Sequence, residues 1–232
     1  MATSKYKVRI YDVVPEDKRK EIYEYSACLG VSINNVNYWD NEKLTALLSW
    51  INSRFSECAI VIADKLHRHN VKIFNNNSEE EGIETGLKLG NELSKNFLTI
   101  VSSLTDCKFR IYRWQDIANE KGTKDELTKV YQAYSTNSSF ARVIEKSAEE
   151  FLFRQKEKGL ELKVRHEEAI KLSCDYILEE MAYFGVAVNL GYVVQLYPGT
   201  QLQILKLLGN GRYQDINLHL SNGFFVDLKI KK

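Results

Sequence analysis

Two segments that lie far apart in the sequence carry residue types that could act on a substrate together. In the first, Gly30 lies in the short apolar run Ala27–Val31, and Ser32 follows that run directly. A glycine lets a substrate approach the backbone, and a serine that leaves a strand is a candidate nucleophile. Asparagines at positions 34, 35 and 37 add hydrogen-bond donors and acceptors nearby. The structural alternative is a serine that only caps a turn.

The second segment is predicted to be helical and covers residues 174–182. Tyr176 and Glu180 are four residues apart, so they share one face of that helix. The surrounding residues are mostly apolar: Cys174, Ile177, Leu178 and Met181. Burial among them would perturb the ionisation of a carboxyl group, as at many functional sites. The alternative is an ordinary amphipathic helix whose glutamates face water.

The elements that must position these residues alternate along the first half of the chain. Strand patterns cover residues 6–12, 27–31, 59–63, 109–114 and 191–197, and helical patterns cover 41–51, 75–97 and most of 125–181. Asn41 is the predicted cap of the first helix. Strand, helix and strand between 27 and 63 favour a right-handed βαβ unit and a parallel sheet. Ligands of such sheets bind beyond the carboxyl ends of the strands, which is where Ser32 lies.

The C-terminal part is less regular. Residues 200–208 fit a helix or a strand, and the helix is favoured. Alternating apolar residues on both sides of Asn222-Gly223 predict a β-hairpin there. No repeat or flexible linker interrupts the chain, so residues 1–232 are predicted to form a single α/β domain.

Composition excludes several classes of protein. Hydrophobic residues make up 44% of the 232 residues and charged residues 27%, as in ordinary globular proteins. No apolar run approaches the roughly 18 residues that a membrane helix needs, and the start lacks the apolar core of a secretory signal. We therefore expect a cytoplasmic protein with no membrane partner. A net charge of +1 excludes a uniformly basic nucleic-acid coat, but it allows a local basic face.

The sequence gives no sign of a metal or cofactor. The four cysteines are scattered without a CxxC pair, which predicts small buried thiols rather than a zinc site or disulfides. His67-Arg68-His69 is neither a metal-binding nor a nucleotide-binding signature. Gly209-Asn210-Gly211 lacks the spacing of a phosphate-binding loop.

Taken together, the motifs resemble those of tRNA-dependent cyclodipeptide synthases. LGVSINNVNYW, followed by LTALLSWINSRF and AIVIAD, is similar to the N-terminal signature of that family. YILEE, with Leu196-Tyr197-Pro198 further on, is similar to the C-terminal signature and suggests the subfamily with Tyr-Pro at the late active-site position. Ser26 stands where the family has histidine, and Ala182 where it has proline.

The resemblance implies a Rossmann-like domain with a mostly parallel sheet flanked by helices, like the catalytic domain of class I aminoacyl-tRNA synthetases. It implies an enzyme that takes two aminoacyl-tRNAs and releases a cyclic dipeptide, a 2,5-diketopiperazine. The aminoacyl ester is already activated, so neither ATP nor a metal is expected. The family expectation is a monomer without a cofactor.

The resemblance also assigns roles to residues. Ser32 would accept the first aminoacyl group, Glu180 would hold its ammonium group and later move a proton from it, and Tyr176 would orient the same amine. Tyr197 would serve the second aminoacyl group. The remaining substrate-binding positions are Gly30, Asn35, Ile60, Ile62 and Pro198, with Ile60 and Ile62 lining the two side-chain pockets.

Phosphates of tRNA must be met by lysine and arginine. The helix over residues 82–97, which is basic in the family, offers only Lys88 and Lys95, so Lys65 and Arg68 are added as tRNA-binding candidates. Basic residues at 72, 108, 110, 113, 229, 231 and 232 are further options. Residues 201–232 carry a local excess of three positive charges, which predicts an asymmetric distribution of charge.

Two other functions remain open from the sequence. One is a catalytically silent module that binds tRNA or an aminoacyl group. The other is a serine hydrolase, which would need a histidine base beside Ser32. The only histidines are His67, His69, His166 and His219.

Overall fold

A computed structural model describes residues 5–33 and 39–232 and confirms the predicted α/β fold. Six strands form one sheet in the order β1-β6-β5-β2-β3-β4. All neighbouring strands are parallel except β1 and β6, which pair antiparallel. The strands are β1 (Lys7–Val14), β2 (Ala27–Val31), β3 (Glu57–Ile62), β4 (Lys108–Arg113), β5 (Val194–Tyr197) and β6 (Phe224–Lys231).

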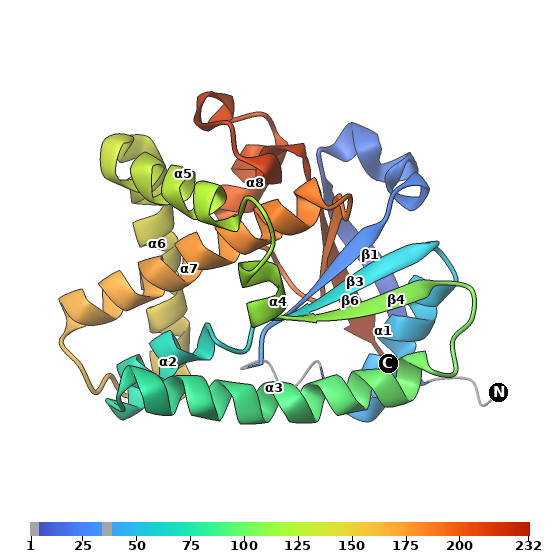
Figure 1. The fold of residues 1–232 in the computed structure, drawn as a ribbon, viewed down its shortest axis with the longest axis horizontal. Coiled ribbons are helices and arrows are strands. Elements are labelled where there is room, and N and C mark those ends of the chain that lie inside the picture. The colour runs from blue at the N-terminus through green and yellow to red at the C-terminus, as the bar shows by residue number, and fades with distance from the viewer. Residues whose placement is uncertain (1–4, 34–38) are drawn as a thin grey trace.

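Helices cover both faces of the sheet. They are α1 (Asn41–Asn52), α2 (His67–Asn75), α3 (Glu79–Val101), α4 (Trp114–Ala118), α5 (Thr123–Thr136), α6 (Ser138–Glu157), α7 (His166–Asn189) and α8 (Gln203–Gly209). Helix α1 packs with one set of strand side chains, and α7 and α8 pack with the alternate set. Figure 1 shows α5, α6 and α7 gathered on one side of the molecule, with α3 running along its lower edge.

Local sequence explains the main elements. The apolar stretches of β2 and β3 are buried on both faces, as expected for the centre of a parallel sheet. Helix α1 is capped by Asp40 rather than by the predicted Asn41, because the Asp40 side chain accepts a hydrogen bond of 3.0 Å from the Lys43 amide. The helix favoured over residues 200–208 is confirmed as α8.

The hairpin predicted at Asn222-Gly223 is wrong. Residues 214–216 and His219–Asn222 form short 3₁₀ turns instead of a strand. Leu218 and Leu220 enter the core beside α7, while β6 pairs with β1 and β5. Partners distant in sequence thus override the local turn signal.

The long helix α3 lies unusually close to the loop after β3. Side chains added at Gly82, Gly86 and Gly90 would meet Arg68, the Asp64 carbonyl oxygen and the Arg113 guanidinium, respectively. Asp64 is fully buried, and Arg113 at the end of β4 pairs with its carboxylate. The three glycines therefore allow α3 to cover a buried ion pair that ties β3 to β4.

We expect Gly86→Ala to lower the free energy of unfolding by about 2 kcal/mol, because the new methyl group would clash with backbone. Helix propensity alone would make Gly86→Ala stabilising. A loss of stability would therefore show that the close packing at this position determines the outcome. Denaturant titration measures it. Thr85→Ala, at the exposed neighbouring position, is the matched control and should change stability by less than about 0.5 kcal/mol. Equal stabilities of the two variants would contradict the close contact.

Candidate active site

A cavity of about 880 Å³ opens where β2 and β5 end. The structure brings four predicted catalytic residues to its wall: Ser32 after β2, Tyr176 and Glu180 from α7, and Tyr197 from the end of β5. This is the edge at which open α/β sheets bind their ligands. The two distant motifs therefore do meet in one site.

Ser32 and Tyr176 line the same cavity, and the Ser32 side chain is close enough to act on the pKa of the Tyr176 phenol, which it lowers. Burial, together with the charge of Glu180, holds the pKa of Tyr176 well above its ordinary value. The phenol therefore stays protonated at neutral pH and can hold the serine hydroxyl in place. The backbone beside it is also fixed, because the Trp39 indole donates a hydrogen bond of 2.8 Å to the Ser32 carbonyl.

Glu180 lies one helical turn after Tyr176 and faces the same cavity. Burial raises the pKa of Glu180 to about 7. Near neutral pH this carboxyl group exists in both protonation states. It can therefore accept the hydrogen bonds of an ammonium group and also receive a proton from it.

Gly30 is required by a neighbouring aromatic ring. A side chain at this position would place its first carbon 2.8 Å from Cζ of Phe184, on α7. Both residues line the cavity, and Phe184 is one turn beyond Glu180. Phe184 was missed by the sequence analysis, although its i+4 spacing from Glu180 was the available signal.

Side chains of β6, α8 and β1 fix the segment that follows β5. The Gln201 amide donates a hydrogen bond of 3.0 Å to Asp227, and Lys206 bridges Asp227 and Asp12 at 2.8 and 2.7 Å. These contacts fix the loop that carries residues 199–203 along the cavity. Pro198 is buried beside this loop and is not among the lining residues.

Two predicted pocket residues lie elsewhere. Ile60 and Ile62 are fully buried on the α1 side of the sheet, with neither lining the cavity. The α7 side of β3 and its continuation carries Ala59, Val61 and Ala63. Neither set of β3 side chains is among the lining residues of this cavity, so the assignment of Ile60 and Ile62 to the two side-chain pockets stays a prediction. Asn35 lies outside the described residues.

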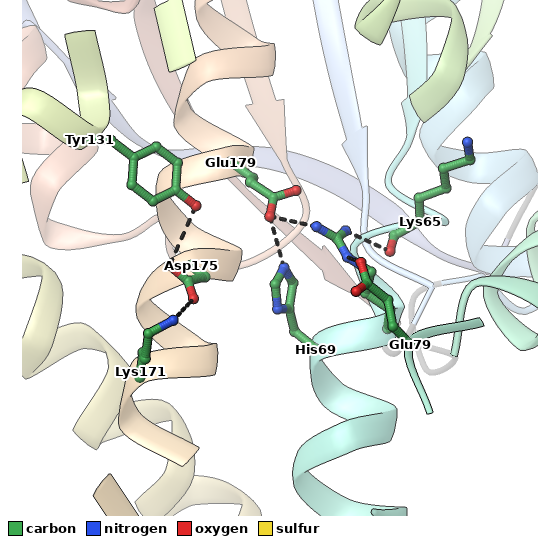
Figure 2. Close-up of polar contacts among 8 residues, drawn as sticks. Lys65, His69, Glu79, Tyr131, Lys171, Asp175 and Glu179 are labelled. Carbon is green, nitrogen blue, oxygen red and sulfur yellow. Dashed lines mark hydrogen bonds and ion pairs between the residues drawn. The ribbon is translucent and has the colours of Figure 1, made fainter. Parts of the chain in front are cut away.

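The tRNA-binding candidates differ in their surroundings. Lys88 and Lys95 are exposed on α3. Lys65 contacts the Gln115 side chain, and Arg68 is held by Glu179 and Glu79 with its side chain 18% exposed (Figure 2). Arg68 therefore already has anionic partners, and the structure does not place it as a phosphate contact.

A basic strip was only partly anticipated. In the antiparallel pair, Lys7 faces Lys231 and Arg9 faces Lys229, and all four are exposed. We call these four residues the basic strip. Within the described residues none of them forms an ion pair, whereas Lys229 lies 3.1 Å from the centre of the exposed Tyr11 ring.

The register places the basic strip near the cavity. Strand β6 runs parallel to β5, with Asp227 beside Tyr197, and then continues to Lys231 beyond the end of β5. Residues 225, 227, 229 and 231 share one face of the strand. Phe225 on that face lines the cavity. The basic strip therefore extends outward from the cavity, on the same side of the sheet.

Metal ligands and histidine bases were both considered as alternatives in the sequence, and the structure places their side chains as follows. Among residues 5–33 and 39–232, no group of three or more His, Cys, Asp or Glu side chains is arranged to hold a metal ion. The cysteines are buried and free, as predicted. In the described part of the chain no hydrogen bond joins Ser32 to a histidine: His69 pairs with Glu179, and His67 lines the cavity with its Nδ1 atom unpartnered. No helix in the described part of the chain is long and apolar enough to span a membrane.

Comparison with known proteins agrees with this site. The family model "Cyclodipeptide synthase" matches residues 20–222. The chain therefore belongs to the cyclodipeptide synthase family and is an enzyme of that family. A search of the curated proteins finds no match.

Solved structures share the whole fold. A cyclodipeptide synthase from Fluoribacter dumoffii is 26% identical with a TM-score of 0.82, covering 97% of this chain and 98% of its own. A Mycobacterium tuberculosis protein, described as showing that cyclodipeptide synthetases are related to type I tRNA synthetases, is 15% identical with a TM-score of 0.71, covering 100% and 96%. The enzyme from Candidatus Glomeribacter gigasporarum, bound to Phe-tRNAPhe, is 20% identical with a TM-score of 0.63, covering 88% and 86%.

The raised pKa of Glu180 predicts a pH dependence of stability. Between the ordinary value of 4.5 and the folded value of about 7, the native state keeps a proton that the unfolded chain releases. This contribution is fully present below pH 4.5 and is lost as the pH rises to 7, by up to about 3 kcal/mol. Glu180→Gln should therefore flatten the loss of stability between pH 5 and 8, as measured by denaturant titration. Glu84→Gln, at an exposed glutamate, should leave the slope as in the parent enzyme. A parental slope in Glu180→Gln would be incompatible with a buried, protonated Glu180.

Proposed function

We propose that this enzyme makes a cyclic dipeptide from two aminoacyl-tRNAs, with Ser32 as the covalent carrier of the first aminoacyl group. The observation that carries the proposal is the meeting of Ser32, Tyr176 and Glu180 in one cavity at the carboxyl end of the sheet. Membership of the family supports it, as does the Phe-tRNAPhe bound to the related enzyme. The Tyr197-Pro198 pair supports the Tyr-Pro subfamily.

The first half-reaction forms an ester on the enzyme. Ser32 Oγ attacks the ester carbonyl of the first aminoacyl-tRNA, while Tyr176 holds the hydroxyl in place. The bond between that carbonyl and the ribose oxygen breaks, and the serine proton leaves with the tRNA. Glu180 holds the ammonium group of the bound aminoacyl group. Splitting the condensation in this way replaces one difficult step with successive acyl transfers.

The second half-reaction forms two amide bonds. Glu180 takes a proton from the ammonium group, and the freed amine attacks the ester of the second aminoacyl-tRNA, whose tRNA departs. Tyr197 lies at the cavity wall, where it can stabilise charge on this second group. The amine of the resulting dipeptide then attacks the Ser32 ester, which closes the ring and returns the proton to Ser32. Both ester substrates are already activated, so this scheme needs neither ATP nor a metal. Nothing in it requires more than a monomer.

Substrate positions follow from the same scheme. Gly30 and Phe184 form the wall next to Ser32, so the first aminoacyl group is proposed to contact both. Asn35 and Pro198 remain proposed contacts of the second substrate through the family resemblance. A cavity that admits ester and amine but little water favours aminolysis over hydrolysis.

Trapping tests the covalent step. Incubation with a pool of charged tRNA should add the mass of one aminoacyl group to the peptide that contains Ser32, and Ser32→Ala should abolish this addition. Ser173→Ala is the matched control, because Ser173 is another serine of the cavity wall. Peptide mass spectrometry reads the label, and analysis of the medium from an expressing bacterium reads the product. Label surviving at the same site in Ser32→Ala would refute the mechanism. Saturable tRNA binding without cyclic dipeptide would identify the silent module instead.

We further infer that the basic strip contacts the tRNA backbone when the aminoacyl end enters the cavity. Like charges facing each other across two strands repel, and an anion lying over them would relieve that repulsion. The position of the basic strip beyond Tyr197 suits an RNA whose 3′ end reaches Ser32. Lys88 and Lys95 remain alternative contacts on α3.

The salt dependence of tRNA binding can distinguish the basic strip from the lysines of α3. Arg9→Ala combined with Lys229→Ala should weaken binding of aminoacyl-tRNA and reduce the slope of log affinity against log salt by about two, if each cation meets a phosphate. The matched double variant Lys88→Ala with Lys95→Ala should change the slope less. Filter binding or fluorescence anisotropy at several salt concentrations measures both. A larger change in the α3 variant would assign tRNA binding to α3 and exclude the basic strip.

A further inference from the structure

Glu179 is next to Glu180 in the sequence, but its side chain lies outside the cavity that Glu180 faces. Successive residues of a helix point about 100° apart, so Glu180 faces the cavity while Glu179 faces α2. There its Oε1 atom lies 2.6 Å from Nη2 of Arg68 and 3.0 Å from Nε2 of His69 (Figure 2). The Glu179 side chain is 14% exposed, and that of His69 is 8% exposed.

The contacts of this group define its charge. Burial alone would raise the pKa of Glu179, but the hydrogen bonds from His69 and Arg68 outweigh it and hold the pKa below its ordinary value. An ionised carboxylate only accepts hydrogen bonds, so Nε2 of His69 carries the proton. Arg68 is itself fixed through the Lys65 carbonyl at 3.0 Å and Glu79 at 3.2 Å. The imidazole ring of His69 is therefore held in one orientation.

His69 connects this network to the active site. The rings of His69 and Tyr176 meet edge to face, with centroids 6.3 Å apart and planes at 68°. The same tyrosine lines the cavity together with Ser32, whose side chain lies close enough to act on the phenol. A chain of contacts thus runs from Arg68 through Glu179 and His69 to the ring that holds the proposed nucleophile.

We propose that Arg68, Glu179 and His69 form a positioning network that orients Tyr176 toward Ser32, with His69 as the positioning residue in contact with the ring. This inference rests on the proposed function. A network that only joined α2 to α7 would affect stability alone. A positioning network must also affect the rate at which a bound aminoacyl-tRNA acylates Ser32, because small displacements of a reacting group are costly.

Two substitutions of one residue separate these roles. His69→Ala removes both the hydrogen bond and the ring, whereas His69→Phe keeps an aromatic edge against Tyr176 and loses only the hydrogen bond. We expect His69→Ala to slow single-turnover acylation of Ser32 at saturating aminoacyl-tRNA by about tenfold to a hundredfold. The affinity for tRNA should be unchanged, and His69→Phe, which keeps the ring but loses the hydrogen bond to Glu179, should recover only part of the rate. Lys171→Gln, which breaks the exposed Lys171–Asp175 ion pair on the same helix, is the matched control and should keep the parental rate.

A second measurement does not depend on turnover. With 3-fluorotyrosine incorporated, the fluorine resonance of Tyr176 (assigned through Tyr176→Phe) should shift or broaden in His69→Ala and should change less in His69→Phe. Thermal unfolding of each variant identifies any loss of folding.

The outcomes separate the two hypotheses. A parental enzyme that never acylates Ser32 would overturn the proposed function, and the fluorine spectra would still test the orientation of Tyr176. A parental enzyme that does acylate Ser32, with His69→Ala equally fast and its Tyr176 resonance unchanged, would overturn the positioning network. Equal losses of rate in His69→Ala and His69→Phe would also refute positioning through the ring.

Discussion

The close approach of α7 to the end of β2 is the constraint on which the site depends. Tyr176 and Phe184 are two helical turns apart, about 12 Å along the axis, while Gly30 and Ser32 are only about 6.6 Å apart on the strand. The two aromatic side chains therefore converge on the strand from either side of Glu180, one on Ser32 and the other on Gly30. A side chain at position 30 would meet the Phe184 ring at 2.8 Å, so the glycine is what lets α7 approach the end of β2 this closely.

The same helix separates two adjacent carboxyl groups by environment. Burial moves the pKa of Glu180 up to about 7. Glu179 is buried with Arg68 and His69, and its pKa moves down. Pairs of acids whose environments drive their pKa values apart have different roles. Here one acid can exchange a proton near neutral pH, and the other keeps a constant charge that fixes its neighbours.

The sequence was informative where a short pattern has only one structural solution. The apolar runs of β2 and β3, and the i+4 spacing of Tyr176 and Glu180, led to the sheet and to one wall of the site. Strand β3 is apolar on both faces, however, so its sequence does not say which of its side chains face a substrate, and the roles of Ile60 and Ile62 stay a prediction. The Asn222-Gly223 signal is local, whereas β6 takes its partners from residues far away in the chain. Likewise, a basic residue such as Arg68 does not show in the sequence that two glutamates already hold it.

Near-neutral overall charge conceals a local asymmetry. Lysines on edge strands often prevent sheets from joining edge to edge. In the β1–β6 pair, four cations face one another directly, an arrangement that opposes the pairing of the strands. Asp12 and Asp227 lie on the same two strands. Both carboxylates form ion pairs with Lys206 and therefore do not neutralise the basic strip. Edge protection does not require cations to face each other across two paired strands, and this arrangement is the reason for proposing an anionic partner over the basic strip.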